Sequence, residues 1–158
     1  MKIMKNGIRL MDGNDIVFGQ TDWSLYAWGC KFGCKHCHTK HCNGPIVEKD
    51  TRDIVNYIIC NSFGSMPYTL CLMGGDVYFQ QEELLSLLER MMYLQNFRIV
   101  IFSGAEPVTG RWHTETVFGR EIMKKVDGLV LGRSVVDGHI VKHIMTAEKT
   151  ERKLVKIV

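Results

Sequence analysis

The chain has 158 residues, a length that suits one domain with one hydrophobic core. Hydrophobic residues make up 46% of it and charged residues 23%, as in ordinary globular proteins, and a net charge of +3 is too small to indicate nucleic-acid binding. The N-terminal residues lack the apolar stretch of a secretory signal, and no apolar run approaches the about 18 residues of a transmembrane helix. We therefore expect a cytoplasmic protein with neither a membrane nor a nucleic acid among its partners.

Strands followed by a loop and then a helix recur along the chain. Strands are predicted at 22–28, 68–73, 97–102 and 129–131, and after these only RKLVKIV at 152–158 has strand character. Helices are predicted at 50–64, 80–95 and 114–126. Asp50 is the expected N-cap of the first helix, and Gly64 is expected to stop it.

This alternation predicts an α/β fold: an open or partial (βα) barrel, built on a mainly parallel sheet with flanking helices. We expect a single domain over 1–158, with a core at about residues 20–135 and a C-terminal extension at 136–158. Ligands of such sheets bind at the carboxyl ends of the strands. Four post-strand segments should converge at that edge, namely a cysteine-rich loop, GGD at 74–76, SGAEP at 103–107 and the Gly132-Arg133 turn.

The segment WGCKFGCKHCHTKHCN at 28–43 holds four of the six cysteines. Cys30, Cys34 and Cys37 have the spacing C-x3-C-x2-C, and three thiolates on a compact loop can hold three irons of a cubane and leave the fourth iron open. An open iron is a place for a substrate or cofactor to coordinate, so the spacing favours a catalytic cluster. Gly29 and Gly33 supply the backbone freedom that a loop around an inorganic cube needs.

Zinc is the main alternative metal. Structural zinc sites take four Cys or His ligands, and Cys34 and Cys37 could pair with His38, His41 or Cys42. Zinc knuckles usually come in two separated halves, however, whereas this chain has one cluster of cysteines. The spacing therefore favours iron–sulfur over zinc.

The remaining cysteines give weaker signals. Cys60 lies on the apolar face of a predicted helix and Cys71 inside a predicted buried strand, so both are expected to be small core residues. Cys42 is too close to the motif to dismiss, and its spacing assigns it no role.

A C-x3-C-x2-C loop after a first strand, followed by a Gly-Gly-acid turn after the second, resembles the radical SAM enzymes. In that family a [4Fe-4S] cluster binds S-adenosylmethionine at its open iron, and one-electron reduction then yields a 5′-deoxyadenosyl radical. The resemblance implies that Cys30, Cys34 and Cys37 are the cluster ligands. It also implies that the Gly-Gly-Asp turn meets the methionine amino group, a cation that suits backbone carbonyls and a carboxylate.

Within that superfamily the short chain is most similar to the activating proteins of anaerobic ribonucleotide reductase. The cysteine loop, LMGGD, IVIFSG and DGLVLGR follow in the same order, over roughly residues 20–135. The resemblance implies that the chain generates a glycyl radical on a large partner enzyme, with electrons from a donor such as flavodoxin or ferredoxin. Its implied cofactor-binding residues are His36, Gly74, Gly75, Asp76, Ser103, Gly104 and Arg133.

Two other functions fit the same residues. One keeps the radical chemistry but acts on a small molecule, as in enzymes similar to 7-carboxy-7-deazaguanine synthase. Such an enzyme needs an enclosed pocket, which Arg111, Trp112 and His113 could line, although the same residues could equally form a surface loop. The other is a non-catalytic zinc-binding module, which would lose folding stability with its ligands. The convergence of four loops on one edge favours an enzyme over that module.

Overall fold

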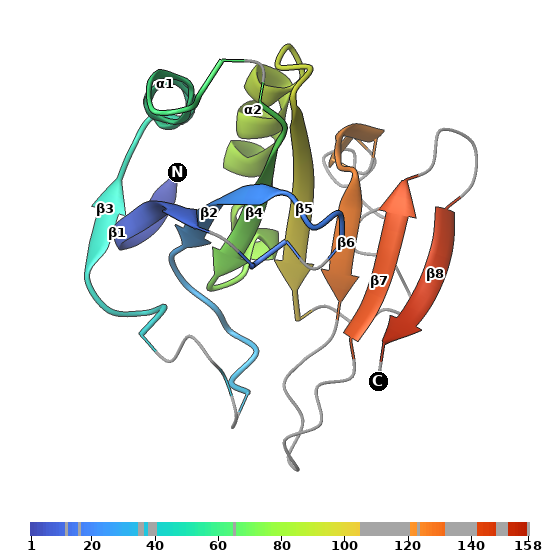
Figure 1. Ribbon diagram of the computed structural model, residues 1–158. Helices are drawn as coiled ribbons and strands as arrows, with labels where there is room; N and C mark the ends of the chain where they lie inside the picture. Colours follow the sequence, from blue (N-terminus) through green and yellow to red (C-terminus); the bar gives the residue numbers. More distant parts are fainter. Residues whose placement is uncertain are drawn as a thin grey trace.

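The computed structural model describes residues 1–11, 13–15, 17–34, 37, 41–64, 66–104, 121–122, 124–131, 142–147 and 152–157. In this part of the chain the strands form one eight-stranded sheet in the order β3-β1-β2-β4-β5-β6-β7-β8 (Figure 1). The strands are β1 (Lys2–Met11), β2 (Thr21–Ala27), β3 (Ile46–Glu48), β4 (Tyr68–Gly74), β5 (Phe97–Ser103), β6 (Gly128–Leu131), β7 (Lys142–Ala147) and β8 (Arg152–Ile157). The helices are α1 (Thr51–Cys60), the 3-10 helix η1 (Val77–Gln80) and α2 (Gln81–Met91).

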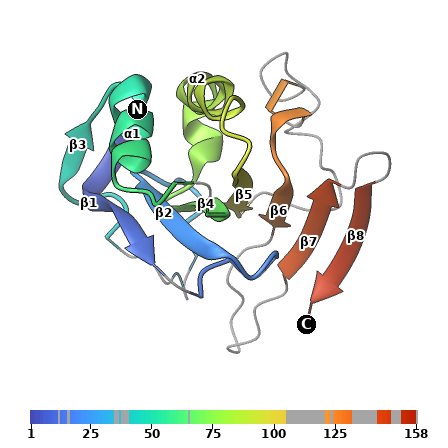
Figure 2. The same ribbon diagram turned by 45° about the horizontal axis from the view of Figure 1, so that its top comes forward.

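The centre of the sheet is parallel, as the sequence predicts. β2, β4, β5 and β6 are neighbours in chain order, and each pairs in parallel with the next. Because consecutive crossovers share one hand, α1 and α2 lie on the same face of the sheet, where they contact each other (Figure 2). Neither helix, nor any other in the described part of the chain, has the length and apolarity needed to span a bilayer. The α/β class is therefore confirmed.

The outer strands correct the expectation of a mainly parallel sheet. β1 pairs antiparallel with both β2 and β3, while β7 and β8 extend the other side as an antiparallel hairpin next to β6. The sheet is thus mixed, and within the described residues its two edges, β3 and β8, do not close into a barrel. The sequence analysis did not predict β1, β3 and β7, because these strands are short or mixed in polarity. β1 also shifts its register with β2 between Ile3 and Ile8, where Asn6 takes a φ of 57°.

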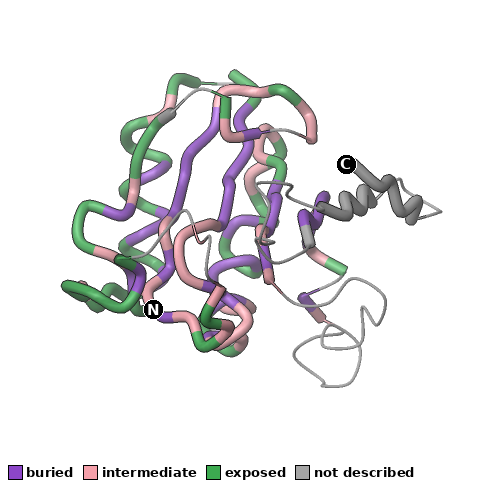
Figure 3. Tube along the Cα trace, turned by 90° about the horizontal axis from the view of Figure 1, so that it is seen from below, coloured by how far each residue is buried: buried purple, intermediate pink, exposed green. Residues whose placement is uncertain are grey.

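The main core lies between the helices and the sheet. Asp50 caps α1 as predicted, since its carboxylate accepts a hydrogen bond from the Arg52 N–H at 2.8 Å. Buried residues follow the central strands in Figure 3, and the first five residues of β4 are all buried. The largest buried side chains of this core are Tyr68, Ile3, Leu25, Ile54, Ile58, Leu70, Leu72, Leu84, Leu87, Leu88, Met91 and Ile101. A strand that is buried on both faces has a continuous run of apolar residues, and for this reason the strand predicted at 68–73 agrees closely with β4.

A second, smaller apolar cluster covers the opposite face of the sheet. Cys71, Val100 and Val130 are buried there, and Val17 and Phe18, from the segment before β2, pack against them. Cys71 is thus the core residue that the sequence predicts. Burial among these groups, together with nearby carboxylates, raises the pKa of its thiol well above the ordinary range.

Asp15 holds the segment before β2 against the sheet. Its carboxylate accepts hydrogen bonds from the N–H groups of Val17 at 3.0 Å, Phe18 at 2.8 Å and Gln20 at 3.0 Å, and from Thr69 Oγ1 on β4 at 2.6 Å. Burial raises the pKa of Asp15, but these hydrogen bonds to the charged form outweigh it and leave the pKa below its usual value. The stabilisation is therefore complete at neutral pH and is lost as the pH falls through the folded-state pKa.

Replacing Asp15 by asparagine should destabilise the fold, because one carboxylate oxygen that accepts two donors becomes an NH2 group. We expect the free energy of unfolding at pH 7 to fall by about 1–3 kcal/mol, measured by urea titration of the reconstituted protein. Asp53→Asn is the matched control, since Asp53 is an exposed residue in the first turn of α1. Equal losses in the two variants would contradict the assigned role of Asp15.

Candidate functional site

The cysteine loop leaves β2 at the carboxyl edge of the parallel strands. Cys30, Cys34 and Cys37 are all partly exposed there, and Gly29 and Gly33 have φ angles of 90° and 64°, which favour glycine. His36 and Arg133, two of the expected cofactor contacts, lie outside the described residues, as do Arg111, Trp112 and His113. The three motif cysteines therefore lie at the edge where the topology predicts ligand binding.

A short turn at residues 41–44 fixes the start of this loop. The Gly29 N–H donates to the carbonyl of Cys42 at 2.7 Å, and the Cys30 N–H donates to Asn43 Oδ1 at 3.2 Å. Asn43 Nδ2 in turn donates to the Cys30 carbonyl at 3.4 Å, and Trp28 Nε1 donates to the carbonyl of Gly44 at 2.8 Å. The backbone of Cys30 is thus held on both sides.

Aromatic rings attach the middle of the loop to η1. The Phe32 ring lies 5.2 Å from that of Phe79 and 6.3 Å from that of Tyr78, centroid to centroid. Lys31 places its Nζ 5.8 Å from the centroid of the Phe79 ring, which adds a cation–π contact. These contacts hold the loop beside the segment that follows the Gly-Gly-Asp turn.

The Gly-Gly-Asp turn packs directly on the beginning of the cysteine loop. The Gly75 N–H donates to the carbonyl of Ala27 at 2.8 Å, and the Asp76 N–H donates to that of Gly29 at 2.9 Å. A Cβ added to Gly75 would fall on the carbonyl oxygen of Gly29 and 2.8 Å from its carbon, while Gly74 has a φ of 91°. Both positions thus require glycine: position 75 because there is no room for a side chain, and position 74 because its φ is positive.

Asp76 connects this turn to the end of β5. Its side chain is buried and accepts hydrogen bonds from Ser103 Oγ at 3.0 Å, from the Gly104 N–H at 2.7 Å and from the Tyr78 N–H at 3.0 Å. The expected site residues from the second and third post-strand segments therefore meet at one carboxylate. Sequence reasoning placed all three at the edge but not in contact, because a hydrogen bond between separate strands leaves no local pattern.

Gln80 is a residue that sequence reasoning missed. Its side-chain amide donates to the carbonyls of Lys2 at 2.8 Å and Trp28 at 3.0 Å, and its Oε1 accepts from the Lys2 N–H at 2.7 Å. It therefore ties η1 to β1 and to the residue before the cysteine loop. A glutamine next to an amphipathic helix gives no signal of such a role.

The thiols influence one another electrostatically. Burial raises the pKa of Cys30, as do the nearby Asp76, Cys42 and Cys34, while the Phe32 N–H at 3.5 Å from its sulfur acts the other way. Burial and then Cys37 raise the pKa of Cys42. Several sulfurs and one carboxylate thus share a small region whose anionic forms repel each other, and a positively charged metal group would offset that repulsion.

Cys60 is exposed at the end of α1, so the expectation that it packs in the core is wrong; the helix ends there, and its last residue faces outward. Across the described residues, no three His, Cys, Asp or Glu side chains are placed to hold a metal ion.

Comparison with known families identifies the class of protein. The family model described as a 4Fe-4S single cluster domain matches residues 13–153, which is most of the chain. The protein therefore belongs to this iron–sulfur family, whose description supports a 4Fe-4S cluster as its cofactor. No individual curated protein and no solved structure matches the chain significantly. The cysteine loop, with its several thiols and with glycines where the Gly-Gly-Asp turn packs against it, fits such a cluster.

Replacing Gly75 by alanine should displace the cysteine loop, because the new Cβ would collide with the Gly29 backbone. We expect a loss of about 1–3 kcal/mol in stability and less iron and sulfide per chain after anaerobic reconstitution. Thermal unfolding and chemical iron and sulfide assays measure these effects. Gly19→Ala is the control, since Gly19 has a φ of 68° but open space around it. Full cluster content in the Gly75 variant would contradict the importance of this contact.

Proposed function

We propose that this iron–sulfur protein is a radical SAM activase. In this proposal Cys30, Cys34 and Cys37 hold three irons of the [4Fe-4S] cluster, and S-adenosylmethionine binds beside the fourth. When bound, the cluster supplies the electron that cleaves the sulfonium of the cofactor reductively, which gives methionine and a radical able to abstract a hydrogen atom. The observation that carries the proposal is the backbone contact between the cysteine loop and the Gly-Gly-Asp turn.

That contact supports cofactor binding by a simple electrostatic argument. The methionine end of the cofactor carries an ammonium group, which favours carbonyl oxygens and nearby negative charge. The Gly-Gly-Asp turn brings backbone close to the cysteine loop, and the buried carboxylate of Asp76 adds negative charge there. Because Asp76 is already bonded to Ser103 and Gly104, we propose that it acts mainly by positioning the turn and the end of β5.

The proposed substrate is a glycine of a large partner enzyme, with anaerobic ribonucleotide reductase as the partner. Support comes from the order of the four motifs along a short chain, which resembles the activating proteins of that enzyme. A partner polypeptide can close the open edge of the sheet and exclude water from the reacting radical. A one-electron donor such as flavodoxin or ferredoxin would reduce the cluster.

The proposal predicts that reconstituted protein, given dithionite and S-adenosylmethionine without oxygen, forms 5′-deoxyadenosine. Cys30→Ala, Cys34→Ala and Cys37→Ala should each form no more than cluster-free protein, because a motif thiolate is lost. Cys60→Ala is the matched control, since this thiol is exposed at the end of α1. Chromatography of the nucleoside products measures the outcome. A tightly held zinc ion without cluster, or full activity in the Cys30 variant, would contradict the proposal.

The substrate is tested by adding a candidate glycyl-radical reductase to the same reaction. A glycyl-radical EPR signal on the reductase, dependent on the wild-type chain, would support activation. Turnover of a pterin-like compound without any protein partner would instead favour the small-molecule reading.

A further inference from the structure

α1 and α2 border an open groove on the face of the sheet that they share (Figure 2). Its volume is about 700 Å³. Val55 and Ile59 line it from α1, and Met92, Tyr93 and Leu94 line it from the turn that follows α2. None of the described residues of the cysteine loop lines it. The groove is therefore separate from the candidate cluster site.

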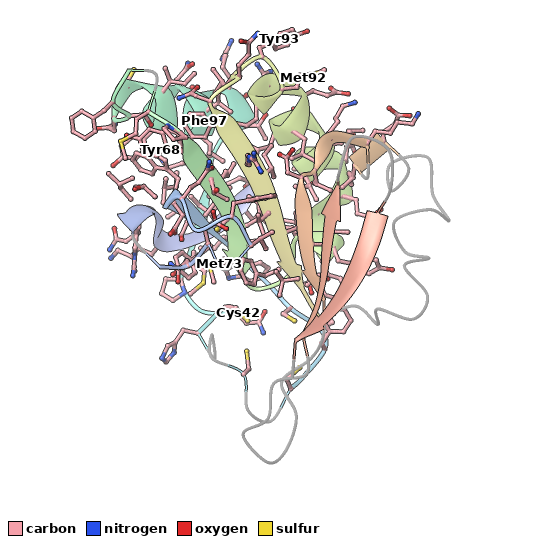
Figure 4. The ribbon with its side chains drawn as sticks, turned by 45° about the vertical axis from the view of Figure 1, so that its right-hand side comes forward. Cys42, Tyr68, Met73, Met92, Tyr93 and Phe97 are labelled. Carbon is pink, nitrogen blue, oxygen red and sulfur yellow. The ribbon has the colours of Figure 1, made fainter. Side chains whose placement is uncertain are left out.

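Three apolar side chains of this groove are exposed to solvent. Tyr93 is 81% exposed, Met92 58% and Ile59 43%. Single exposed apolar residues are ordinary, but three along one groove form a patch of the kind that binds another protein. Figure 4 places Met92 and Tyr93 at the opposite end of the protein from Cys42. A protein bound in the groove would therefore leave the edge that carries the cysteine loop open.

Basic side chains line the same groove. Arg52, Arg90 and Lys125 are three of its described lining residues, whereas Glu89 is the one acidic residue among them. Lys125 also forms an ion pair with Glu121, at 3.6 Å, so the two arginines carry most of the excess positive charge. The groove thus combines an exposed apolar patch with a basic border.

Arg90 is held in a fixed orientation at this border. Its Nε donates to Thr51 Oγ1 at 3.2 Å, and this oxygen lies 2.9 Å from Ser86 Oγ, within hydrogen-bond distance. Thr51 is buried at the start of α1, so the contact joins the two helices. The bond uses one of the five N–H groups of the guanidinium, and the terminal N–H groups can still bind a carboxylate in a bidentate way.

We propose that this groove binds an acidic amphipathic helix of the large partner enzyme. The inference rests on the proposed function, which requires such a partner. A groove bordered by helices accepts a further helix through apolar side chains at i, i+3, i+4 and i+7. Carboxylates beside those apolar residues would pair with Arg52 and Arg90. Tyrosine and arginine are also the residue types that most often dominate the energy of a protein interface.

Charge and position argue against two other occupants. A symmetric dimer centred on the groove would place Arg52 and Arg90 of each copy against the same arginines of the other, and like charges repel. An electron donor must approach the cluster, whereas Met92 and Tyr93 lie at the other end of the protein. A large partner meets both conditions, since it can present acidic side chains here while its glycine reaches the cluster edge.

A synthetic helix tests the groove without knowledge of the partner's sequence. The probe is a fluorescent peptide with leucines at i, i+3, i+4 and i+7 and with glutamate and alanine elsewhere, and its anisotropy is measured with the reconstituted protein. We expect saturable binding that Arg52→Glu and Tyr93→Ser each weaken about tenfold. Lys5→Glu and Leu10→Ser, at exposed positions of β1 outside the groove, are the matched controls and should bind as wild type does. Absence of saturable binding, or equal affinities in all variants, would overturn the inference.

Two further measurements test the charge and the occupant. A peptide with lysine in place of glutamate should bind about tenfold more weakly, and equal binding of the two peptides would overturn the inference. Size-exclusion chromatography of the protein alone tests for a second copy. A dimer of the wild-type chain that Tyr93→Ser dissociates would likewise overturn the inference, because the groove would then be covered by the chain itself.

The same peptide distinguishes a failure of this inference from a failure of the proposed function. Added to the activation reaction, it should lower the glycyl-radical EPR signal on the reductase several-fold and leave the formation of 5′-deoxyadenosine unchanged. An unchanged radical signal at saturating peptide would overturn the inference. If no glycyl radical forms even without peptide, the proposed function fails, whereas peptide binding that depends on Arg52 and Tyr93 still supports the groove.

Discussion

Two backbone hydrogen bonds beyond the end of the β2–β4 pairing determine the rest of the site. The Gly75 N–H bonds to Ala27 and the Asp76 N–H bonds to Gly29, so the two post-strand segments stay side by side after the strands have ended. Only glycine at position 75 leaves room for this approach. From that contact the cysteine loop begins in a fixed place, and Asp76 is aimed at the end of β5.

The mixed sheet explains how the chain holds a loop this rich in cysteines. The parallel strands β2, β4 and β5 bring three loop segments to one edge, while antiparallel β1 lies alongside β2. Gln80 joins the start of β1 to Trp28 and to η1 through three hydrogen bonds. The loop is thus supported by the edge of the sheet and by the 3-10 helix, as well as by the turn at 41–44.

The same region of the protein gathers groups that are negatively charged when ionised. Four thiols and a buried carboxylate lie at one end of the protein, and their mutual repulsion is relieved by a cluster whose irons carry positive charge. Membership of the 4Fe-4S single cluster family agrees with this arrangement. The proposed radical chemistry follows from where that charge is placed relative to the Gly-Gly-Asp turn.

The sequence by itself predicted the central βα units, an iron–sulfur cofactor and the edge of the sheet at which the candidate site lies. Apolar runs such as 68–73 and the C-x3-C-x2-C spacing are local patterns, so they can be read without a structure. Tertiary structure decided the antiparallel outer strands, the bonding of Asp76 to Ser103, the exposure of Cys60 and the position of Cys42. The reason is that each of these depends on segments that are distant in sequence, and nothing within either segment records which partner the folded chain will bring to it.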